Sequence, residues 1–82
     1  MQLTTYQNFQ LRDAIELKFD GPVRNQADCQ SLSAFIEASN NKKVSSHTLR
    51  RFFKIVQWDG EFRVKTLDIL AEFAGYSNIS AF

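Results

Sequence analysis

The chain has 82 residues, of which 44% are hydrophobic and 23% charged, and its formal net charge is +1. This composition is typical of an ordinary soluble globular domain and argues against a disordered chain. Cys29 is the single cysteine, so an internal disulfide is excluded, and no apolar run approaches the roughly 20 residues that span a bilayer. The N-terminus has neither the basic start nor the apolar stretch of a signal peptide. These features together predict a cytoplasmic protein.

Charge is distributed unevenly along the chain. Residues 40–65 contain seven basic and two acidic side chains, a net charge of +5. Residues 1–39 contain three basic and five acidic side chains, and residues 66–82 contain two acidic ones. A basic segment of this kind can bind phosphate groups, or it can interact with acidic segments of the protein itself. Charge alone leaves both interpretations open.

A first helix is predicted within residues 1–19, with Thr4 or Thr5 as its N-cap. Its apolar residues recur at helical spacing and are Leu11, Ala14, Ile15 and Phe19. The run Asp20-Gly21-Pro22 should end this helix, because glycine adopts the left-handed C-terminal conformation and proline cannot continue a helix.

A second helix is predicted to begin at Asp28, whose carboxylate can accept backbone N–H bonds as an N-cap, after a linker over residues 21–27. Its apolar side consists of Leu32, Phe35, Ile36 and Ser39, with Cys29 close to the same stripe. Residues 40–43 read Asn-Asn-Lys-Lys, interrupt the pattern and predict a turn.

A third helix is predicted to begin at Ser45 or Ser46 and to extend to about residue 56. One side is an apolar stripe at spacing i, i+3, i+4 and i+7, formed by Leu49, Phe52, Phe53 and Val56. The opposite side presents polar and basic residues within an arc of about 100°. These residues are His47, Arg50, Arg51 and Lys54.

A loop with Gly60 at its tip is predicted to follow. The alternative is a short β-hairpin over residues 56–64, because Asp59-Gly60 lies between alternating apolar residues. Either structure leaves the third helix in place.

A fourth helix is predicted over residues 64–75, and its wide apolar arc indicates a central position in the fold. Gly75 should end it, and Ser77 should cap a last short turn over residues 77–82. The predicted fold is therefore all-α, a compact bundle of four or five short helices in a single domain over residues 1–82.

Catalysis is poorly supported by the sequence. His47 and Cys29 are the only histidine and cysteine, which leaves no zinc-type cluster, and the chain has no glycine-rich phosphate loop. Asp68 and Glu72 are four residues apart on the predicted fourth helix, but an exposed acidic face is the simpler interpretation of this pair. We therefore expect no enzyme activity, no bound metal and no cofactor.

The second and third predicted helices indicate a nucleic-acid-binding module. A helix, a short turn and a helix that opens Val-Ser-Ser-His-Thr-Leu-Arg-Arg match the layout of helix-turn-helix DNA-binding proteins. The major groove accepts one α-helix, and side chains near the start of that helix reach the base edges. The predicted contact face consists of Ser46, His47, Arg50, Arg51 and Lys54, and the predicted phosphate contacts around it are Lys42, Lys43, Arg63 and Lys65.

These residues also have a purely structural interpretation. Serines before an apolar run are commonly helix caps, and the arginines could form a solubilising surface without a partner. Trp58 and Phe62 are expected to anchor the core or the loop rather than to stack on bases, because single-strand platforms usually need several aromatic rings on a basic face.

The segment from Val44 to Phe82 resembles a bacterial helical domain. Its pattern is S-x-x-T-L-R-R-F-F, a variable loop, then T-L-D-x-L-A-x-[YF]-x-G-Y-S-x-x-x-x-F, which residues 45–53, residues 66–77 and Phe82 match. The segment is also distantly similar to lambda-repressor-like helix-turn-helix domains, in which V-S-x-x-T-[LI]-x-R opens the recognition helix. The matching residues are Val44, Ser45, Thr48, Leu49 and Arg51. The resemblance implies a helix-turn-helix-like fold and an N-terminal module of a longer protein.

The predicted function is binding of nucleic acid, most simply duplex DNA, through the third helix. So few charges would bind weakly and salt-sensitively, which implies a homo-oligomer or a partner domain. The alternative is a protein-interaction or self-association module of a larger intracellular signalling or effector protein. In that case basic residues 40–65 of one copy would contact the acidic first and fourth helices of another. Neither prediction involves a membrane.

Overall fold

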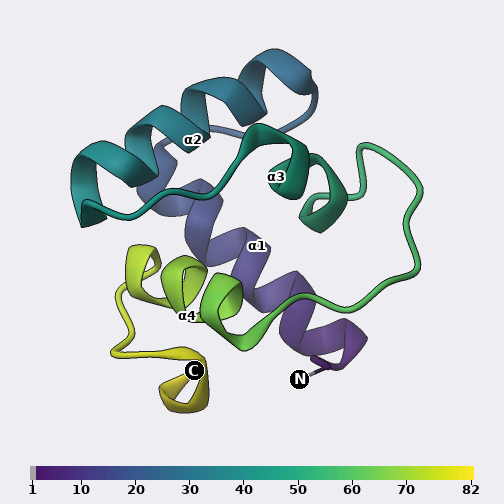
Figure 1. Ribbon diagram of the computed structural model, residues 1–82, viewed down its shortest axis with the longest axis vertical. Coiled ribbons are helices and arrows are strands. Elements are labelled where there is room, and N and C mark those ends of the chain that lie inside the picture. The colour runs from purple at the N-terminus through teal and green to yellow at the C-terminus, as the bar shows by residue number, and fades with distance from the viewer. Residues whose placement is uncertain (1) are drawn as a thin grey trace.

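The computed structural model describes residues 2–82, which form four α-helices and a short 3-10 helix (Figure 1). No strand occurs within this range, so the all-α prediction is confirmed, and residues 57–63 form an irregular loop instead of the alternative β-hairpin. Within residues 2–82 no helix combines the length and hydropathy that crossing a bilayer requires. The elements are α1 (Thr5–Phe19), α2 (Gln26–Asn40), α3 (Ser46–Phe52), α4 (Val64–Phe73) and η1 (Ile79–Ala81).

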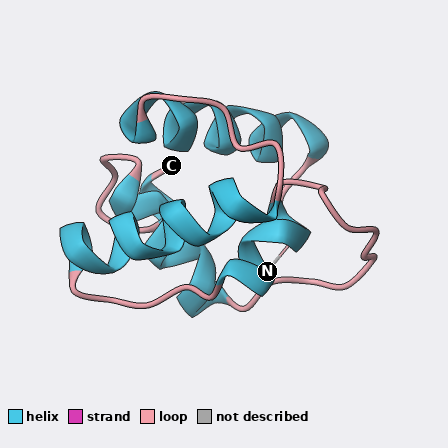
Figure 2. Ribbon diagram, turned by 90° about the horizontal axis from the view of Figure 1, so that it is seen from above, coloured by secondary structure: helices cyan, strands magenta, loops and turns pink. Residues whose placement is uncertain are grey.

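The helices pack in two pairs that share one core. α2 packs against α3 and α4, α1 packs against α4, and η1 closes the C-terminal end of α4. Figure 1 and Figure 2 show that α1 lies behind α4 and that the long loop between α3 and α4 extends at one side of the molecule. α3 therefore packs mainly on α2.

The core takes apolar side chains from every helix. The largest fully buried ones are Phe52, Phe73, Leu11, Ile15, Leu32, Ile36, Leu49, Leu67, Leu70 and Cys29. Burying each of the Leu, Ile and Phe side chains stabilises the fold by about 1.5–3 kcal/mol. The predicted apolar side of α2 is correct at Cys29, Leu32 and Ile36, but Ser39 is exposed and Phe35 is 40% exposed. The ring of Phe35 still meets Phe73 edge-on, with centroids 5.5 Å apart.

α1 begins after the predicted cap and ends at Phe19. Thr4 caps the helix, because its Oγ1 accepts a bond from the Gln7 N–H at 3.1 Å and the Gln7 Oε1 accepts one from the Thr4 N–H at 2.9 Å. At the other end Asp20, rather than the expected Gly21, takes the left-handed conformation, with φ 65°. The Gly21 N–H then bonds to the carbonyl of Glu16, which completes the C-terminal cap.

The N-cap of α2 is Asn25, so the prediction of Asp28 as the cap is wrong. The Asn25 Oδ1 accepts a bond from the Asp28 N–H at 2.9 Å, and the Asp28 Oδ2 accepts one from the Arg24 N–H at 2.9 Å. Both side chains satisfy N–H groups at the helix start, and Asp28 is the acidic residue of the first turn. The helix therefore begins at Gln26, two residues ahead of Asp28.

α3 ends at Phe52, so the prediction of a helix to about residue 56 is wrong. A continued helix would direct the Val56 N–H to the Phe52 carbonyl. The Nε of Arg12, on α1, donates to that carbonyl instead, at 2.8 Å. The chain turns at Lys54, which has φ 61°, and the Ile55 N–H bonds back to Arg50 O at 2.9 Å. This is a Schellman-type end with lysine at the position that usually holds glycine.

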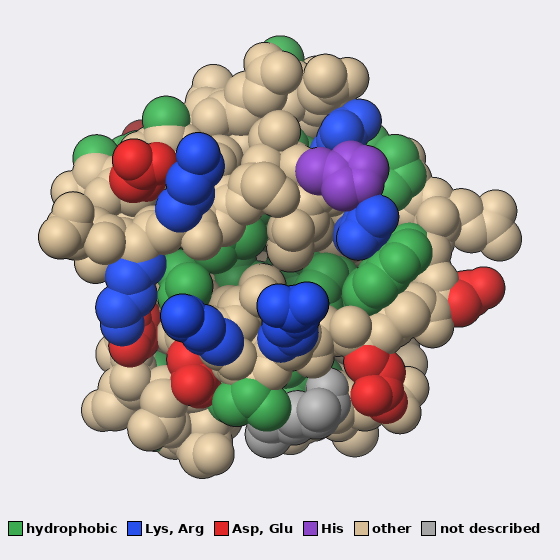
Figure 3. All heavy atoms as spheres, in the orientation of Figure 1, with side chains coloured by type: hydrophobic (Ala, Val, Ile, Leu, Met, Phe, Trp, Pro, Cys, Tyr) green, Lys and Arg blue, Asp and Glu red, His purple; other side chains and the backbone are tan. Residues whose placement is uncertain are grey.

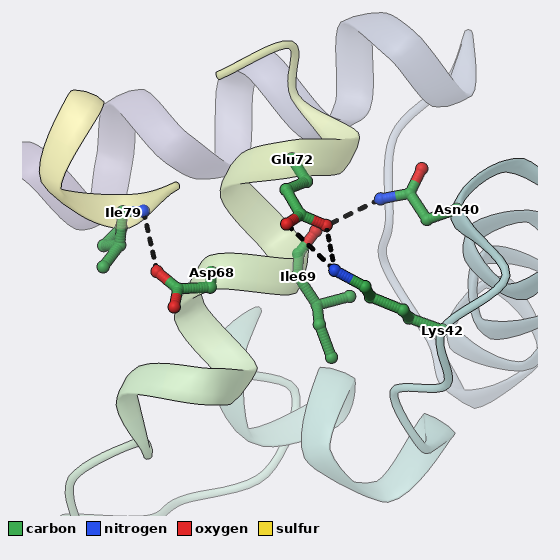
Figure 4. Close-up of polar contacts among 6 residues, drawn as sticks. All are labelled: Asn40, Lys42, Asp68, Ile69, Glu72 and Ile79. Carbon is green, nitrogen blue, oxygen red and sulfur yellow. Dashed lines mark hydrogen bonds and ion pairs between the residues drawn. The ribbon is translucent and has the colours of Figure 1, made fainter. Parts of the chain in front are cut away.

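The acidic residues of α4 serve different partners, as Figure 4 shows. The Asp68 carboxylate accepts a bond from the Ile79 N–H at 2.9 Å and holds η1 against α4, so this residue is half-buried rather than outward-facing. Glu72 forms an ion pair with Lys42 at 2.9 Å. Asp68 therefore holds η1 against α4, whereas Glu72 connects α4 to Lys42 after the end of α2.

The C-terminal end of α4 matches the prediction only in part. Gly75 has φ 107° and ends the helix region as expected, with the Tyr76 N–H bonded to Ala71 O. Asn78 caps η1 through a bond from the Ala81 N–H at 2.9 Å, so the prediction of Ser77 as this cap is wrong.

The backbone at Lys54 generates a stability prediction. A residue with a Cβ in the left-handed region is strained relative to glycine. Lys54→Gly should therefore raise the free energy of unfolding by about 0.5–1 kcal/mol, measured by urea denaturation. Lys43→Gly is the matched control, because Lys43 is exposed and lacks a positive φ, and it should be neutral or destabilising. Equal effects of the two substitutions would contradict the prediction.

The buried thiol generates a pH prediction. Burial raises the pKa of Cys29, while the positive charge of Arg50 acts in the opposite direction. The folded protein thus keeps the thiol proton at a pH where the unfolded chain has lost it, and stability should fall as the pH rises past the ordinary thiol pKa. Urea denaturation from about pH 7 to about pH 10 should show a steeper decline for the wild-type chain than for Cys29→Ala. Parallel declines would contradict this assignment.

Candidate nucleic-acid interface

The buried side of α3 determines where its polar side chains emerge. Leu49 is 0% exposed and Phe52 is 1% exposed, so the side of the helix that they occupy faces the core. His47 is exposed on the other side, and Arg50 and Arg51 are half-buried. The structure therefore brings together three of the predicted contact residues on about one turn of helix.

His47 lies between the two arginines. The Nη2 of Arg50 is 2.9 Å from the histidine Nδ1, and the Nη2 of Arg51 is 2.9 Å from the Nε2. A neutral imidazole accepts a hydrogen bond at only one of its nitrogens, because the other carries the proton. One of the two arginine–His47 contacts can therefore be a hydrogen bond. In the other contact an arginine N–H faces the N–H of the imidazole.

The stem of Arg50 is covered while its end reaches the surface. Its Nε is buried and has no hydrogen-bond partner among the described residues. Nε belongs to the guanidinium group, so this charged group is partly desolvated while its Nη2 contacts His47.

Arg51 stacks on the only tryptophan of the chain. Its Cζ lies 5.1 Å from the centroid of the Trp58 ring, within the range of a cation–π contact. Phe62 supports the indole from another side, with ring centroids 4.7 Å apart. Gly60 approaches so closely that a Cβ at this position would overlap the indole ring. Trp58 thus fixes the loop and the position of Arg51 together.

A shallow groove connects α3 to the start of α4. Arg51 and Thr48 line it from α3, and Arg63 and Thr66 line it from the other side, with Trp58 and Phe62 in the loop between them. Arg63 is the N-cap residue of α4 and is exposed. The groove also contains the carboxylate residue Glu61, so it is not uniformly basic.

The remaining predicted residues differ in what surrounds them. Lys42 is paired with Glu72, whereas Lys43 and Lys65 are exposed and form no ion pair within residues 2–82. Ser46 is the first residue of α3, while Ser45 is its N-cap. Lys54 lies beyond the end of α3, so the helical arc predicted for it does not apply, and it lines a hollow beside α1.

Positive side chains lie beside the histidine on the face drawn in Figure 3. The view shows Lys and Arg groups next to the histidine and others toward its middle and left, with acidic groups beside several of the latter. Within residues 2–82 the single ion pair is the one between Lys42 and Glu72, so no carboxylate neutralises Arg50, Arg51 or Arg63 at contact distance. We call the surface formed by His47, Arg50, Arg51 and Arg63 the basic face.

The sequence did not indicate the support that Trp58 and Arg12 give to this face. Trp58 follows Arg51 by seven residues, and only the folded loop brings the two side chains together. Arg12 is 40 residues away from the carbonyl that it binds at the end of α3. Comparison of the chain with protein-family models, curated proteins and solved structures found no match.

The contact between Gly60 and Trp58 generates a prediction about the loop. Gly60→Ala should displace the indole ring, weaken its stacking with Arg51 and lower the free energy of unfolding by about 1–3 kcal/mol. Trp58 is the only tryptophan, so its fluorescence spectrum reports the change directly. Gly21→Ala is the matched control, because a Cβ at Gly21 meets nothing within 4 Å. Unchanged emission in Gly60→Ala would contradict the close packing of this glycine on the indole.

Proposed function

We propose that the chain binds nucleic acid, most simply duplex DNA, through the basic face. The observation that carries this proposal is the lack of internal neutralisation: Arg50, Arg51 and Arg63 have no carboxylate of residues 2–82 at ion-pair distance. Unpaired arginines on one face can contact several phosphates of a duplex and release its counterions. α3 follows α2 directly, which is the helix order of a helix-turn-helix module, and the connection of five residues is longer than the usual three or four.

The arrangement around His47 supports phosphate as the ligand group. Two arginine donors meet one imidazole that can accept from only one of them. A phosphate oxygen supplies acceptors for the remaining donor, and Arg–phosphate hydrogen bonds are among the stronger ones because they are charge-assisted. The bound phosphate would therefore replace an unfavourable contact between two donors.

The residues contribute unequally under this proposal. Arg50, Arg51 and Arg63 supply the main phosphate contacts, and His47 and Ser46 lie at the start of α3, where base edges come within reach. Lys43 and Lys65 add weaker contacts. Lys42 contributes less because Glu72 offsets its charge.

A second candidate function is head-to-tail self-association, which a different surface favours. Three large apolar side chains of α1 are exposed: Tyr6 is 70% exposed, Phe9 60% and Leu17 83%. Asp13 and Asp20 are also exposed in this segment, and residues 5–20 have three acidic and two basic side chains, a net charge of −1 that is opposite in sign to the basic face. In this arrangement α1 of one copy packs on the basic face of the next.

Duplex binding distinguishes the two functions. Arg50→Gln combined with Arg63→Gln should lower the affinity for a random-sequence duplex at least about tenfold at low salt, measured by fluorescence anisotropy. The slope of log affinity against log salt should become shallower by about 0.9 for each phosphate that the variant no longer neutralises. The matched control, Lys18→Gln with Arg24→Gln, removes the same charge from the acidic N-terminal segment and should change the affinity much less.

Two outcomes of this binding experiment would contradict duplex binding through the basic face. If both double variants bind duplex equally well, the basic face is not the contact surface. If no duplex binds and the Arg50/Arg63 variant dissociates an oligomer seen by sedimentation velocity, self-association is the function of this surface.

A further inference from the structure

A second concave site lies beside the basic face. It is a hollow of about 240 Å³ between the start of α1, the end of α3 and the loop before α4. This volume lies somewhat below the range of about 300–1,000 Å³ that is typical of small-molecule pockets, so it suits a ligand of few atoms. The hollow is lined by three cations, Arg12, Arg51 and Lys54, and by the aromatic rings of Phe52, Trp58 and Phe62.

The cations of the hollow form no ion pair with residues 2–82. Arg12 is half-buried, donates its Nε to the Phe52 carbonyl and stacks its guanidinium 5.5 Å from the Phe52 ring centroid. That bond fixes the orientation of the guanidinium, while its Nη groups form no hydrogen bond to the described residues. Asp59 and Glu61 also line the hollow, yet neither is within ion-pair distance of a cation. The lining therefore carries a formal charge of +1, from three cations and two carboxylates.

The backbone at Lys54 determines where this residue lies. Lys54 has φ 61°, a conformation that glycine adopts without strain and that lysine does not favour. This conformation ends α3 in a Schellman-type turn, and the turn places Lys54 among the residues that line the hollow.

We propose that this hollow binds a small organic phosphate. The phosphate contacts Arg12, Arg51 and Lys54, because three cations suit a dianion, and arginine guanidinium groups fit phosphate oxygens in pairs. The organic part lies against the rings of Trp58 and Phe62, which line the hollow and are half-buried. Asp59 and Glu61 accept hydrogen bonds from its hydroxyl or amino groups.

Titration with three probes tests the proposal. Adenosine monophosphate, inorganic phosphate and adenosine are each added to the full chain, and binding is followed by calorimetry and by Trp58 fluorescence. The monophosphate should bind in the millimolar range or more tightly, inorganic phosphate more weakly, and adenosine not measurably. Lys54→Gly should weaken binding of the monophosphate about fivefold to tenfold while the protein stays folded.

Two further variants make the outcome decisive. Arg12→Gln should also weaken binding, and Lys43→Gln, which changes a lysine outside the hollow, should leave it unchanged. The proposal is overturned if neither phosphate probe binds at about 10 mM, if adenosine binds as well as its monophosphate, or if Lys54→Gly binds like the wild-type chain. Lys54→Gly relieves backbone strain and should therefore stay folded. The test can then be decided with this variant even if Arg12→Gln fails to fold.

Discussion

The anchoring of α3 by two buried side chains is the constraint on which the rest of the structure depends. Leu49 and Phe52 point into the core with almost no exposure, and the spacing of a helix then directs His47, Arg50 and Arg51 outward. The seven-residue helix is too short to be stable alone, so this tertiary packing holds it. Truncating Leu49 or Phe52 would therefore alter the positions of His47, Arg50 and Arg51 together.

Several carboxylates of the chain are engaged elsewhere, which leaves the basic face without internal neutralisation. Glu16 accepts a bond from the Val23 N–H at 2.7 Å, and Asp28 and Asp68 likewise accept bonds from backbone N–H groups. Glu72 pairs with Lys42. A carboxylate that holds a backbone turn cannot also neutralise a distant arginine. The same contacts that define loops and caps therefore keep the arginines available to an external anion.

Periodicity in the sequence predicts the helices and the core well but predicts their ends less well. The clustering of His47 with the arginines follows from residues three and four apart on a helix, a spacing that can be read directly from the chain. The end of α3 does not follow, because the Phe52 carbonyl bonds to Arg12 on another helix and no local signal marks Lys54 as left-handed. For the same reason periodicity assigns Lys54 to the α3 surface, whereas the fold directs it to the hollow.

Mapping of backbone amide resonances during addition of a short duplex tests most directly whether the basic face contacts nucleic acid. At low salt we expect the largest shifts at residues 46–51 of α3 and at residues 63–66 before and within the start of α4. The exposed side of α1, around Phe9 and Asp13, should remain unshifted. Shifts confined to α1, or no shifts at any residue of the basic face, would contradict the claim that these arginines form the contact surface.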